Sequence, residues 1–482
     1  MRFAKIVCTL GPSSSDKDTI LKLIKAGMDV ARLNFSHGTF ESHAELIQLI
    51  RSCAAESKHP ISILQDLQGP KLRVGILPPN GIQLESGQTL SLFFTGNGKE
   101  DFSGPDFSLP LDVPNIDKSV KPGYRILLDD GHIELVVKKI IDQSVVTKVI
   151  IGGILTSHKG VNLPGAHLGI PSFTDKDRKD LEFGLRHGID YVAISFVETA
   201  QDIVFVREVM KNISPDKYFT PIIAKLERPE AVKNLHEIIH VADGVMVARG
   251  DLGVETSPSM VPIMQKEIIQ AANRHAKIVI TATQMLDSMI HNPRPTRAEA
   301  SDVANAIFDG TDAVMLSGET ASGDYPIESV KMMDSIVREA EKHSEEWGKC
   351  REFPNEVIQD DSLSICNAAR ELAHDRKVSN IAVFTQSGKT ALLMSKARPR
   401  VPIMAFTPEI KTLSLSNLYW GVIPVLVPFS NSLEEMVHSV DHALKQSSSL
   451  KPGEQVVLIS GFPVGAMRLP NLALLHTVGE EV

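Results

Sequence analysis

The sequence has few cysteines, no long apolar segment and no excess of positive charge. Its four cysteines, Cys8, Cys53, Cys350 and Cys366, lie far apart without metal-ligand spacing, which predicts buried free thiols in a reducing compartment. No apolar stretch reaches the ~18 residues of a membrane span, and the N-terminal apolar run is too short for a signal peptide. We therefore expect a soluble, cytoplasmic protein with no membrane partner.

The net charge of the chain limits the kinds of ligand that it can bind. A net charge of −9 argues against non-specific nucleic-acid binding, so any anionic ligand must be held by a local group of basic residues. Apolar residues at 43% and charged residues at 23% are ordinary globular values. A chain of 482 residues has room for about three domains.

One apolar phrase recurs along the first two thirds of the chain. Four segments share an Asp or Gly turn, a Val-rich run and a polar residue at its end: AGMDVARLNFS from Ala26, HGIDYVAISFV from His187, VADGVMVARGD from Val241 and DGTDAVMLSGE from Asp309. Four more share the last two parts: AKIVCTLGP, ISILQDLQG, PIIAKLERP and KIVITATQM. Eight short strands alternating with helical stretches predict a parallel barrel, whose active site lies at the carboxyl ends of the strands. An open doubly wound sheet is the alternative.

Two segments depart from this pattern. From Arg73 to Asn162 the chain alternates like β-structure, which predicts a β insertion on a barrel loop. After Glu341 a new α/β pattern begins, with strands SNIAVFT, VPIMAFT, VIPVLVP and EQVVLIS. The expected domains are a barrel in two parts, an inserted β domain and a C-terminal α/β domain: 1–70 with 172–345, 71–171, and 356–482.

In a barrel, the polar residues at the strand ends converge on one cavity. They are Arg32, Asn34, Ser36, Asp66, Lys225, Glu227, Arg249, Asp251, Thr283, Ser317 and Glu319. Glu227 and Asp251 end neighbouring strands and could share Mg²⁺, which is commonly held by two carboxylates with water and substrate oxygens. Surface acids paired with Arg228 and Arg249 are the alternative. Lys225, two residues before Glu227, points to the same side of its strand and adds a fixed ammonium.

Other strand-end residues suit a small acid. Gly250 and Gly253 in RGDLGVE permit a sharp turn, whose free N–H groups could take a carboxylate or phosphate. Thr283 and Ser317 could position a water or relay a proton, or simply cap the following helices. The residues thus predict a site for a divalent metal and a small phosphorylated acid. Phosphoryl transfer, aldol-type cleavage and lyase chemistry all remain open.

Several runs resemble the pyruvate kinase family. They are RLNFSHG (32–38), KGVNLPG (159–165), ARGDLGVE (248–255), TATQMLDSM (281–289), NPRPTRAEASDVANA (292–306) and MLSGETASGDYP (315–326). The resemblance implies an α/β fold made of an eight-stranded parallel (TIM) barrel, an inserted β-barrel lid domain and a C-terminal α/β regulatory domain. It implies phosphoryl transfer from phosphoenolpyruvate to ADP, giving pyruvate and ATP, with Mg²⁺ or Mn²⁺ as cofactor, a homotetramer and a phosphorylated allosteric effector.

The resemblance also implies residue roles. Glu227 and Asp251 resemble the metal ligands, and Lys225 resembles the group that neutralises the phosphoryl and the enolate. Arg32 and Arg73 look like phosphate-binding arginines, and Asn34, His37 and Lys159 like nucleotide contacts. Thr283, with the backbone of Gly250 and Asp251, would bind substrate. Ser317 and Glu319 look like a water relay that protonates the enolate, and the insertion would close over the nucleotide.

Two further features concern regulation. The loop TQSGKT, with Thr385, Gln386, Ser387, Gly388, Lys389 and Thr390, resembles the family's effector-phosphate loop, or is an ordinary strand-to-helix cap. The family's Gly-Thr-Thr-Asn near the C-terminus is here Arg468-Leu469-Pro470-Asn471, a departure that bears on the identity of any effector.

The stretch DLQGPKLRVG (66–75) concerns K⁺, which many members need. By resemblance its ligands would fall at Asn34, Ser36, Asp66 and position 67, with a glutamate at position 71. The first three remain, but Leu67 removes a hydroxyl and Lys71 introduces an ammonium. With Gln68 and Val74, this pattern resembles members that work without K⁺. Lys71 is therefore predicted to supply the positive charge itself.

Two rival functions remain. A metal-dependent phosphoenolpyruvate lyase or aldolase would have little need of the nucleotide-side residues Arg73 and Lys159. A non-catalytic sugar-phosphate sensor would keep the last domain and predicts a damaged strand-end set, yet Lys225, Glu227, Asp251 and Thr283 are all present.

Overall fold

The computed structural model describes residues 2–95, 107–166, 169–216, 219–348, 361–447 and 450–480. Its central element is a closed barrel of eight strands in the order β1-β17-β16-β15-β14-β13-β3-β2. All neighbouring pairs are parallel. The strands are β1 (Lys5–Thr9), β2 (Val30–Asn34), β3 (Ser62–Asp66), β13 (Tyr191–Ile194), β14 (Ile222–Leu226), β15 (Gly244–Ala248), β16 (Ile278–Ala282) and β17 (Ala313–Leu316). These are the eight predicted strands, and the open sheet is excluded.

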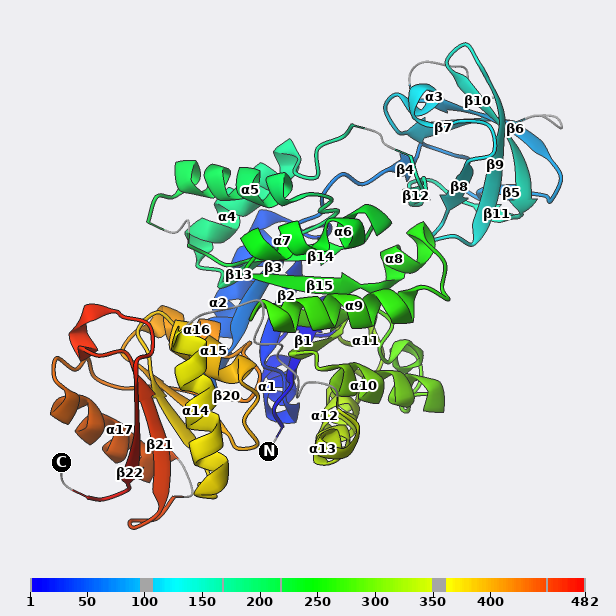
Figure 1. Ribbon diagram of the computed structural model, residues 1–482. Helices are drawn as coiled ribbons and strands as arrows, with labels where there is room; N and C mark the ends of the chain where they lie inside the picture. Colours follow the sequence, from blue (N-terminus) through cyan, green and yellow to red (C-terminus); the bar gives the residue numbers. More distant parts are fainter. Residues whose placement is uncertain are drawn as a thin grey trace.

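Helices surround the barrel (Figure 1). They are α1 (Lys17–Ala26), α2 (Phe40–Ser57), α4 (Asp175–His187), α5 (Ala200–Ile213), α6 (Pro229–Lys233), α7 (Leu235–Val241), α8 (Arg249–Glu255), α9 (Val261–Arg274), η1 (Asp287–Ile290), α10 (Arg297–Asp309), α11 (Gly318–Ala321), α12 (Pro326–Lys342) and α13 (Ser344–Trp347). Thr39, Thr174 and Thr296 each cap a helix with a reciprocal capping box. Their apolar faces join the outer surfaces of the strands in the main core, which fixes the barrel.

The recurring phrase of the sequence has a structural cause at the amino ends of the strands, the foot of the barrel. An aspartate before every second strand accepts the backbone N–H of the strand preceding it in sequence and also pairs with a cation. The N–H to carboxylate distances are 2.7–2.8 Å for Ile6 to Asp29, Ile63 to Asp190, Ile222 to Asp243 and Val279 to Asp312. The cations are Arg2, Arg51, Arg207 and Lys396 respectively. Each aspartate therefore locks two successive strands together.

The β insertion leaves the barrel after β3 and lies apart from it (Figure 1). It has a seven-stranded sheet in the order β12-β8-β9-β10-β6-β7-β4 and a two-stranded sheet, β11-β5. Its elements are β4 (Arg73–Val74), β5 (Ile82–Leu84), β6 (Thr89–Phe94), β7 (Phe107–Asp112), α3 (Ile116–Ser119), β8 (Arg125–Leu128), β9 (Ile133–Ile141), β10 (Ser144–Ile151), β11 (Gly153–Leu155) and β12 (Val161–Asn162). The two ends of the seven-stranded sheet meet, because the N–H of Val161 in β12 donates to the carbonyl of Leu72 at 3.1 Å and the N–H of Val74 in β4 donates to the carbonyl of Lys159 at 2.8 Å. This agrees with the predicted β-barrel form, and β5 and β11 form a separate pair.

The C-terminal part is a five-stranded sheet in the order β20-β19-β18-β21-β22. Its elements are α14 (Asp361–Asp375), β18 (Ile381–Phe384), α15 (Lys389–Lys396), β19 (Ile403–Thr407), α16 (Ile410–Ser416), β20 (Val422–Leu426), α17 (Leu433–Ser447), β21 (Gln455–Ser460), η2 (Val464–Ala466) and β22 (Leu472–Thr477). The sequence predicts the first four strands but not β22. That strand pairs antiparallel with β21 and needs no crossover helix, so it lacks the helical pattern that marks the others.

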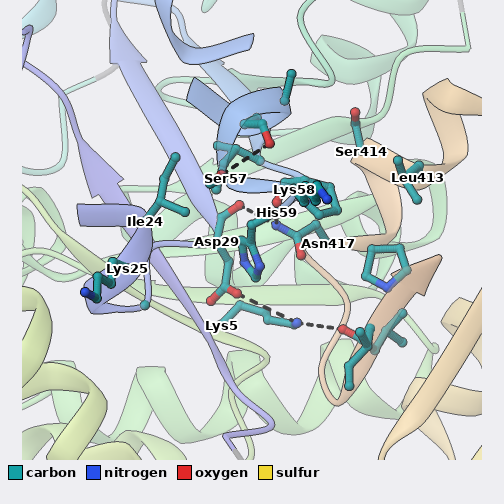
Figure 2. A pocket seen from close by; sticks show the side chains of 18 of the residues that line it. Lys5, Ile24, Lys25, Asp29, Ser57, Lys58, His59, Leu413, Ser414 and Asn417 are labelled. Carbon is teal, nitrogen blue, oxygen red and sulfur yellow. Dashed lines mark hydrogen bonds and ion pairs between the residues drawn. The ribbon is translucent and has the colours of Figure 1, made fainter. Parts of the chain in front are cut away.

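This C-terminal sheet is fixed to the foot of the barrel. Lys5 of β1 donates to the carbonyl of Val422 in β20 at 2.7 Å, and Asn417 donates to the carbonyls of Asp29 and Pro60 at 2.7 and 2.6 Å. Figure 2 shows Lys5, Asp29 and Asn417 in the cavity between the two parts. The insertion lies at the opposite end of the barrel (Figure 1).

Of the four cysteines, the three that the structure describes, Cys8, Cys53 and Cys366, are buried free thiols, as predicted; Cys350 lies outside the described residues. Among the helices of the described part of the chain, none is long and apolar enough to cross a membrane.

Candidate active site at the carboxyl ends of the barrel strands

Lys225, in β14, is the centre of the charged group at the rim of the barrel. Its Nζ lies 2.8 Å from Glu227 Oε1 and 3.2 Å from Asp66 Oδ1, and it donates to Ser195 Oγ at 2.7 Å. Burial alone would lower the pKa of Lys225, but Asp66 and Glu227 hold it above its usual value. The site therefore contains a permanently charged, fixed ammonium.

Asp66, at the end of β3, holds two cations at once. Its second oxygen pairs with Arg32 Nε at 2.7 Å, and Arg32 also donates to Thr9 Oγ1 at 2.9 Å. Burial acts to raise the pKa of Asp66, yet Lys225 and Arg32 together bring it below the usual range. Asp66 thus stays ionised and holds both cations together at the rim.

Glu227 and Asp251 form the predicted metal pair. Glu227 is only 1% exposed, and its Oε2 accepts the backbone N–H of Phe196 at 2.8 Å. Burial raises the pKa of Glu227 to about 7, with Lys225 opposing and Asp251 adding to the rise. Burial likewise raises the pKa of Asp251, where Lys225 opposes. The two acids repel each other, and a divalent cation between them would relieve that repulsion.

The donor set fits Mg²⁺ or Mn²⁺. Both side chains offer hard carboxylate oxygens, and within the described ranges no cluster of three or more His, Cys, Asp or Glu forms a complete metal cage. Two protein carboxylates with water and substrate oxygens are the usual arrangement for such an ion. The alternative of surface acids bridged to Arg228 and Arg249 is wrong, because those arginines pair with Glu198 and Asp302.

Thr283 sits in a strained turn after β16, where it and Gln284 have φ values of +67° and +54°. Its Oγ1 accepts the N–H of Gly250 at 3.0 Å and donates to the carbonyl of Ala282 at 2.7 Å. Arg249 donates to the carbonyl of Thr283 at 2.8 Å and so supports this turn rather than pointing into the cavity. The expectation of a free N–H at Gly250 is therefore wrong.

Glu319 follows β17 and is almost fully buried. Its carboxylate accepts the backbone N–H groups of Ser317 at 2.7 Å and Leu286 at 3.1 Å, and burial raises its pKa. The hydroxyl of Ser317 is also buried, and no described residue gives it a hydrogen-bond partner. An unpaired buried hydroxyl suits an ordered water, and it does not cap α11.

The insertion contacts the rim beside α8. Asn162 Nδ2 donates to Glu255 Oε1 of α8 at 2.8 Å. Lys71 and Asp130 line the same small pocket as Asp251. Burial and the charge of Arg73 lower the pKa of Lys71, while Asp130 and Asp251 oppose the change. Lys71 therefore belongs to the charged group of the site.

Two other nucleotide-side candidates lie beside Lys71. Burial, followed by the charges of Lys71, Arg73 and Arg32, lowers the pKa of His37. Arg73 Nη1 donates to the carbonyl of His158 at 2.8 Å. Lys159 instead pairs with Asp129 of the insertion at 2.7 Å. Asn34 is turned to its own loop, because its Oδ1 accepts the N–H of Ser36 at 3.1 Å.

Two site residues are missing from the predicted set. Thr9 is the last residue of β1 and Ser195 follows β13, the two strands for which no polar end residue was predicted. They contact Arg32 and Lys225 respectively. Their place just after an apolar run was the available signal. A neutral hydroxyl at a strand end looks like a turn residue until its partner is known.

The TQSGKT segment follows β18 in the C-terminal part, far from the rim, and its last two residues, Lys389 and Thr390, begin α15 (Figure 1). Gly388 has a φ of +82° and donates to Thr385 Oγ1 at 3.0 Å, which closes the turn. The loop lines a small pocket together with Ser460, Gly461 and Arg468.

A closed parallel barrel with a fixed ammonium, an arginine and a pair of buried acids at its carboxyl rim is typical of an enzyme whose site lies at that rim. Comparison with known proteins narrows this class. Residues 1–330 match the family model described as pyruvate kinase, barrel domain, and residues 363–476 match pyruvate kinase, alpha/beta domain. The chain belongs to the pyruvate kinase family and is a phosphotransferase.

Curated relatives agree over the full length. The chain is 42% identical over 462 residues to a pyruvate kinase of Agrobacterium vitis, covering 96% of this chain and 94% of that protein. It is 43% identical over 485 residues to one of Geobacillus stearothermophilus, covering 99% and 81%. It is 40% identical over 480 residues to one of Corynebacterium glutamicum, covering 100% and 98%.

Proposed function

We propose that the protein transfers the phosphoryl group of phosphoenolpyruvate to ADP, giving pyruvate and ATP. The observation that carries this proposal is Lys225, held between Asp66 and Glu227 by contacts of 3.2 and 2.8 Å. A fixed ammonium at that point can neutralise the phosphoryl group and then the enolate. Membership of the family supports the same reaction.

Each rim residue then takes a role. Arg32 and Lys225 hold the phosphoryl oxygens, and Thr283 with the backbone N–H of Asp251 holds the substrate carboxylate. Ser317 and Glu319 order the water that protonates the enolate carbon. Glu227 and Asp251 would hold Mg²⁺ or Mn²⁺, which supplies Lewis-acid neutralisation of phosphate charge when bound.

The nucleotide binds on the insertion side, against Asn34, His37, Arg73 and Lys159. Lys159 has to leave Asp129 to reach it, which closure of the insertion would allow. Closure also excludes water, so that phosphoryl transfer is not lost to hydrolysis.

One assay tests this function against its rivals. The enzyme is supplied with phosphoenolpyruvate and MgADP, and ATP and pyruvate are followed together. Equal amounts of both support the kinase. Pyruvate without ATP supports a lyase or hydrolase, and no turnover alongside effector binding supports a sensor.

We also propose that the enzyme works without K⁺. Leu67 offers no hydroxyl, and Asp66 already pairs with Arg32 and Lys225. The ammonium of Lys71, at about 5 Å from a K⁺ ion, would repel it by roughly 3 kcal/mol at an effective dielectric near 20. Asn34, Ser36 and Asp66 would then be the remnant of a monovalent site.

The test of K⁺ independence is kcat/KM at fixed ionic strength, with tetramethylammonium or K⁺ as the only monovalent cation. A rise above about tenfold with K⁺, equivalent to ~1.4 kcal/mol, contradicts the proposal. The Leu67→Thr, Lys71→Glu double variant should be nearly inactive until K⁺ is added.

For regulation, we propose that Thr385, Gln386, Ser387, Gly388, Lys389 and Thr390 bind a phosphorylated effector. The loop's hydroxyls, its Lys389 and the nearby Arg468 suit a phosphate group. Lys389→Glu should abolish activation by whichever phosphorylated metabolite activates the wild type, with basal activity kept. Unchanged activation would assign the effector to another site.

The remaining proposals concern organisation. We propose that residues 1–70 with 172–345, 71–171 and 356–482 act as three domains, that the protein is a homotetramer, and that it works in the cytoplasm. Light scattering after gel filtration measures the oligomeric state; a monomer would contradict the tetramer.

A further inference from the structure

The loop between β2 and α2, residues 35–39, carries part of the nucleotide side of the site. Ser36 and His37 belong to it, and Asn34 lies at its start. Its backbone is held internally by Ser36 and His37, whose N–H groups donate to the side chain and carbonyl of Asn34 at 3.1 and 3.3 Å. The position of His37 therefore depends on the contacts between this loop and the rest of the barrel.

His43, in the first turns of α2, makes one of these outer contacts. Its Nε2 lies 2.9 Å from the carbonyl oxygen of His37, and its ring is buried. A carbonyl oxygen only accepts, so His43 carries a proton on Nε2 and donates it. The capping box of Thr39 and Ser42 fixes the start of α2 and hence the position of this donor.

The ring of His43 has little freedom. It stacks on Phe35 with ring centroids 4.0 Å apart and an angle of 7° between the planes. At the edge of the ring, Gly38 has a φ of +82°, and a Cβ atom there would lie 3.1 Å from His43 Nε2. The loop is therefore folded closely around the imidazole.

A second contact comes from α4. Lys176 Nζ donates to the carbonyl of Phe35 at 2.7 Å and to Asp180 at 2.6 Å. The N–H of Phe35 donates to the carbonyl of Asp66 at 3.0 Å. Phe35 is thus fixed on both sides, whereas the carbonyl of His37 depends on His43.

Building on the proposed nucleotide role of His37, we propose that His43 is a positioning residue for nucleotide binding. By holding the carbonyl of His37, it keeps the His37 ring beside Lys71 and Arg73, where the diphosphate would lie. It touches neither substrate itself. Its loss should weaken the nucleotide side of the reaction and leave phosphoenolpyruvate binding largely intact.

The experiment compares three variants. His43→Leu removes the donor but keeps an apolar side chain against Phe35, and His43→Gln restores an N–H donor. His187→Leu is the matched control, because His187 stacks on Phe183 of the same aromatic cluster at 4.0 Å and its Nδ1 bonds to the carbonyl of Phe183 in its own helix.

Three measurements are made: hydrogen exchange of the peptide covering residues 34–40, the Kd of MgADP by equilibrium dialysis, and KM for each substrate. In His43→Leu we expect faster exchange in this peptide and a rise of about tenfold in the Kd and KM of ADP, with KM for phosphoenolpyruvate within about threefold. His43→Gln and His187→Leu should remain within about threefold of wild type.

Several results would overturn the proposal. Unchanged exchange in His43→Leu would show that the bond does not hold the loop. Faster exchange without a change in MgADP binding would separate the loop from the nucleotide, and equal losses for both substrates would point to general destabilisation. If the wild type makes no ATP, the proposed function fails, but exchange and MgADP binding still decide the role of His43.

Discussion

The two ends of the barrel both contain buried charges, and they use them differently. At the foot, Asp29, Asp190, Asp243 and Asp312 each accept one strand N–H and pair with a nearby cation. At the rim, Lys225 is shared between Asp66 and Glu227, and Glu227 and Asp251 repel each other with raised pKa values. Buried charge alone is therefore no sign of catalysis.

The difference lies in what is left unsatisfied. Both carboxylate oxygens of Asp312 have partners. Lys396 Nζ lies 2.5 Å from one and Arg398 Nη2 lies 2.7 Å from the other, and Val279 donates its backbone N–H. The rim acids keep an electrostatic conflict that a metal ion or a substrate can resolve. A group that is already satisfied stabilises the fold, and one that still lacks a partner can bind.

The largest effect is expected from a substitution in the charged group at the rim. Lys225→Met should lower kcat for phosphoryl transfer by ~10²–10³, because it removes a fixed charge aimed at developing negative charge. Metal binding, followed by Mn²⁺ paramagnetic resonance, should be largely retained. A kcat within about tenfold of wild type, only ~1.4 kcal/mol, would mean that Lys225 has no such role.

The same substitution at the foot is the matched comparison. Lys396 is fully buried, and in Lys396→Met the carboxylate of Asp312 loses this ammonium and keeps its ion pair with Arg398. We expect a loss of about 2 kcal/mol in the free energy of unfolding, below the ~3–5 kcal/mol of breaking a buried pair outright. Urea unfolding measures it, and kcat of the folded enzyme should change less than threefold. A catalytic loss as large as that of Lys225→Met would remove the distinction between the two ends.

A smaller effect sharpens the comparison through pH. Metal binding needs the ionised form of Glu227, whose pKa is raised to about 7 by burial. As pH falls below 7 the proton competes with the metal, so the apparent affinity for Mn²⁺ should fall by roughly tenfold per pH unit. The affinity should level off above pH 7.

Glu341 provides the control for this pH profile. Its pKa is also raised to about 7 by burial, but it lies at the foot, where it accepts the N–H groups of Phe3 and Ala4. Glu341→Gln should leave the pH dependence of Mn²⁺ binding unchanged. If it abolishes that dependence, the titration does not belong to the rim.

Much of the fold could be predicted because barrel strands and helices are local patterns. Eight buried runs, each followed by a turn and a helix, are visible in the sequence without knowledge of their partners. Most of the rim residues follow from the same pattern, since parallel strands place their carboxyl ends together. The edge strand β22, without a crossover helix, gave no such pattern.

Within the site, most of the failures are residues whose role depends on a partner far away in the chain. Arg249 stands at a strand end but turns to Asp302 and supports Thr283. Thr9 and Ser195 look like ordinary turn hydroxyls until Arg32 and Lys225 reach them. His43 is the exception, because its partner His37 is only six residues away, but nothing in its helical spacing indicates a contact with the loop before α2.

The sequence by itself determined the barrel, its strand order along the chain and the acids and bases available at its rim, because short-range periodicity and turn chemistry encode these. Only the tertiary structure decided which charge meets which, which N–H is free and which acid keeps a raised pKa. Those properties arise from burial and from distances between residues that are remote in the chain, and both exist only once the barrel has closed.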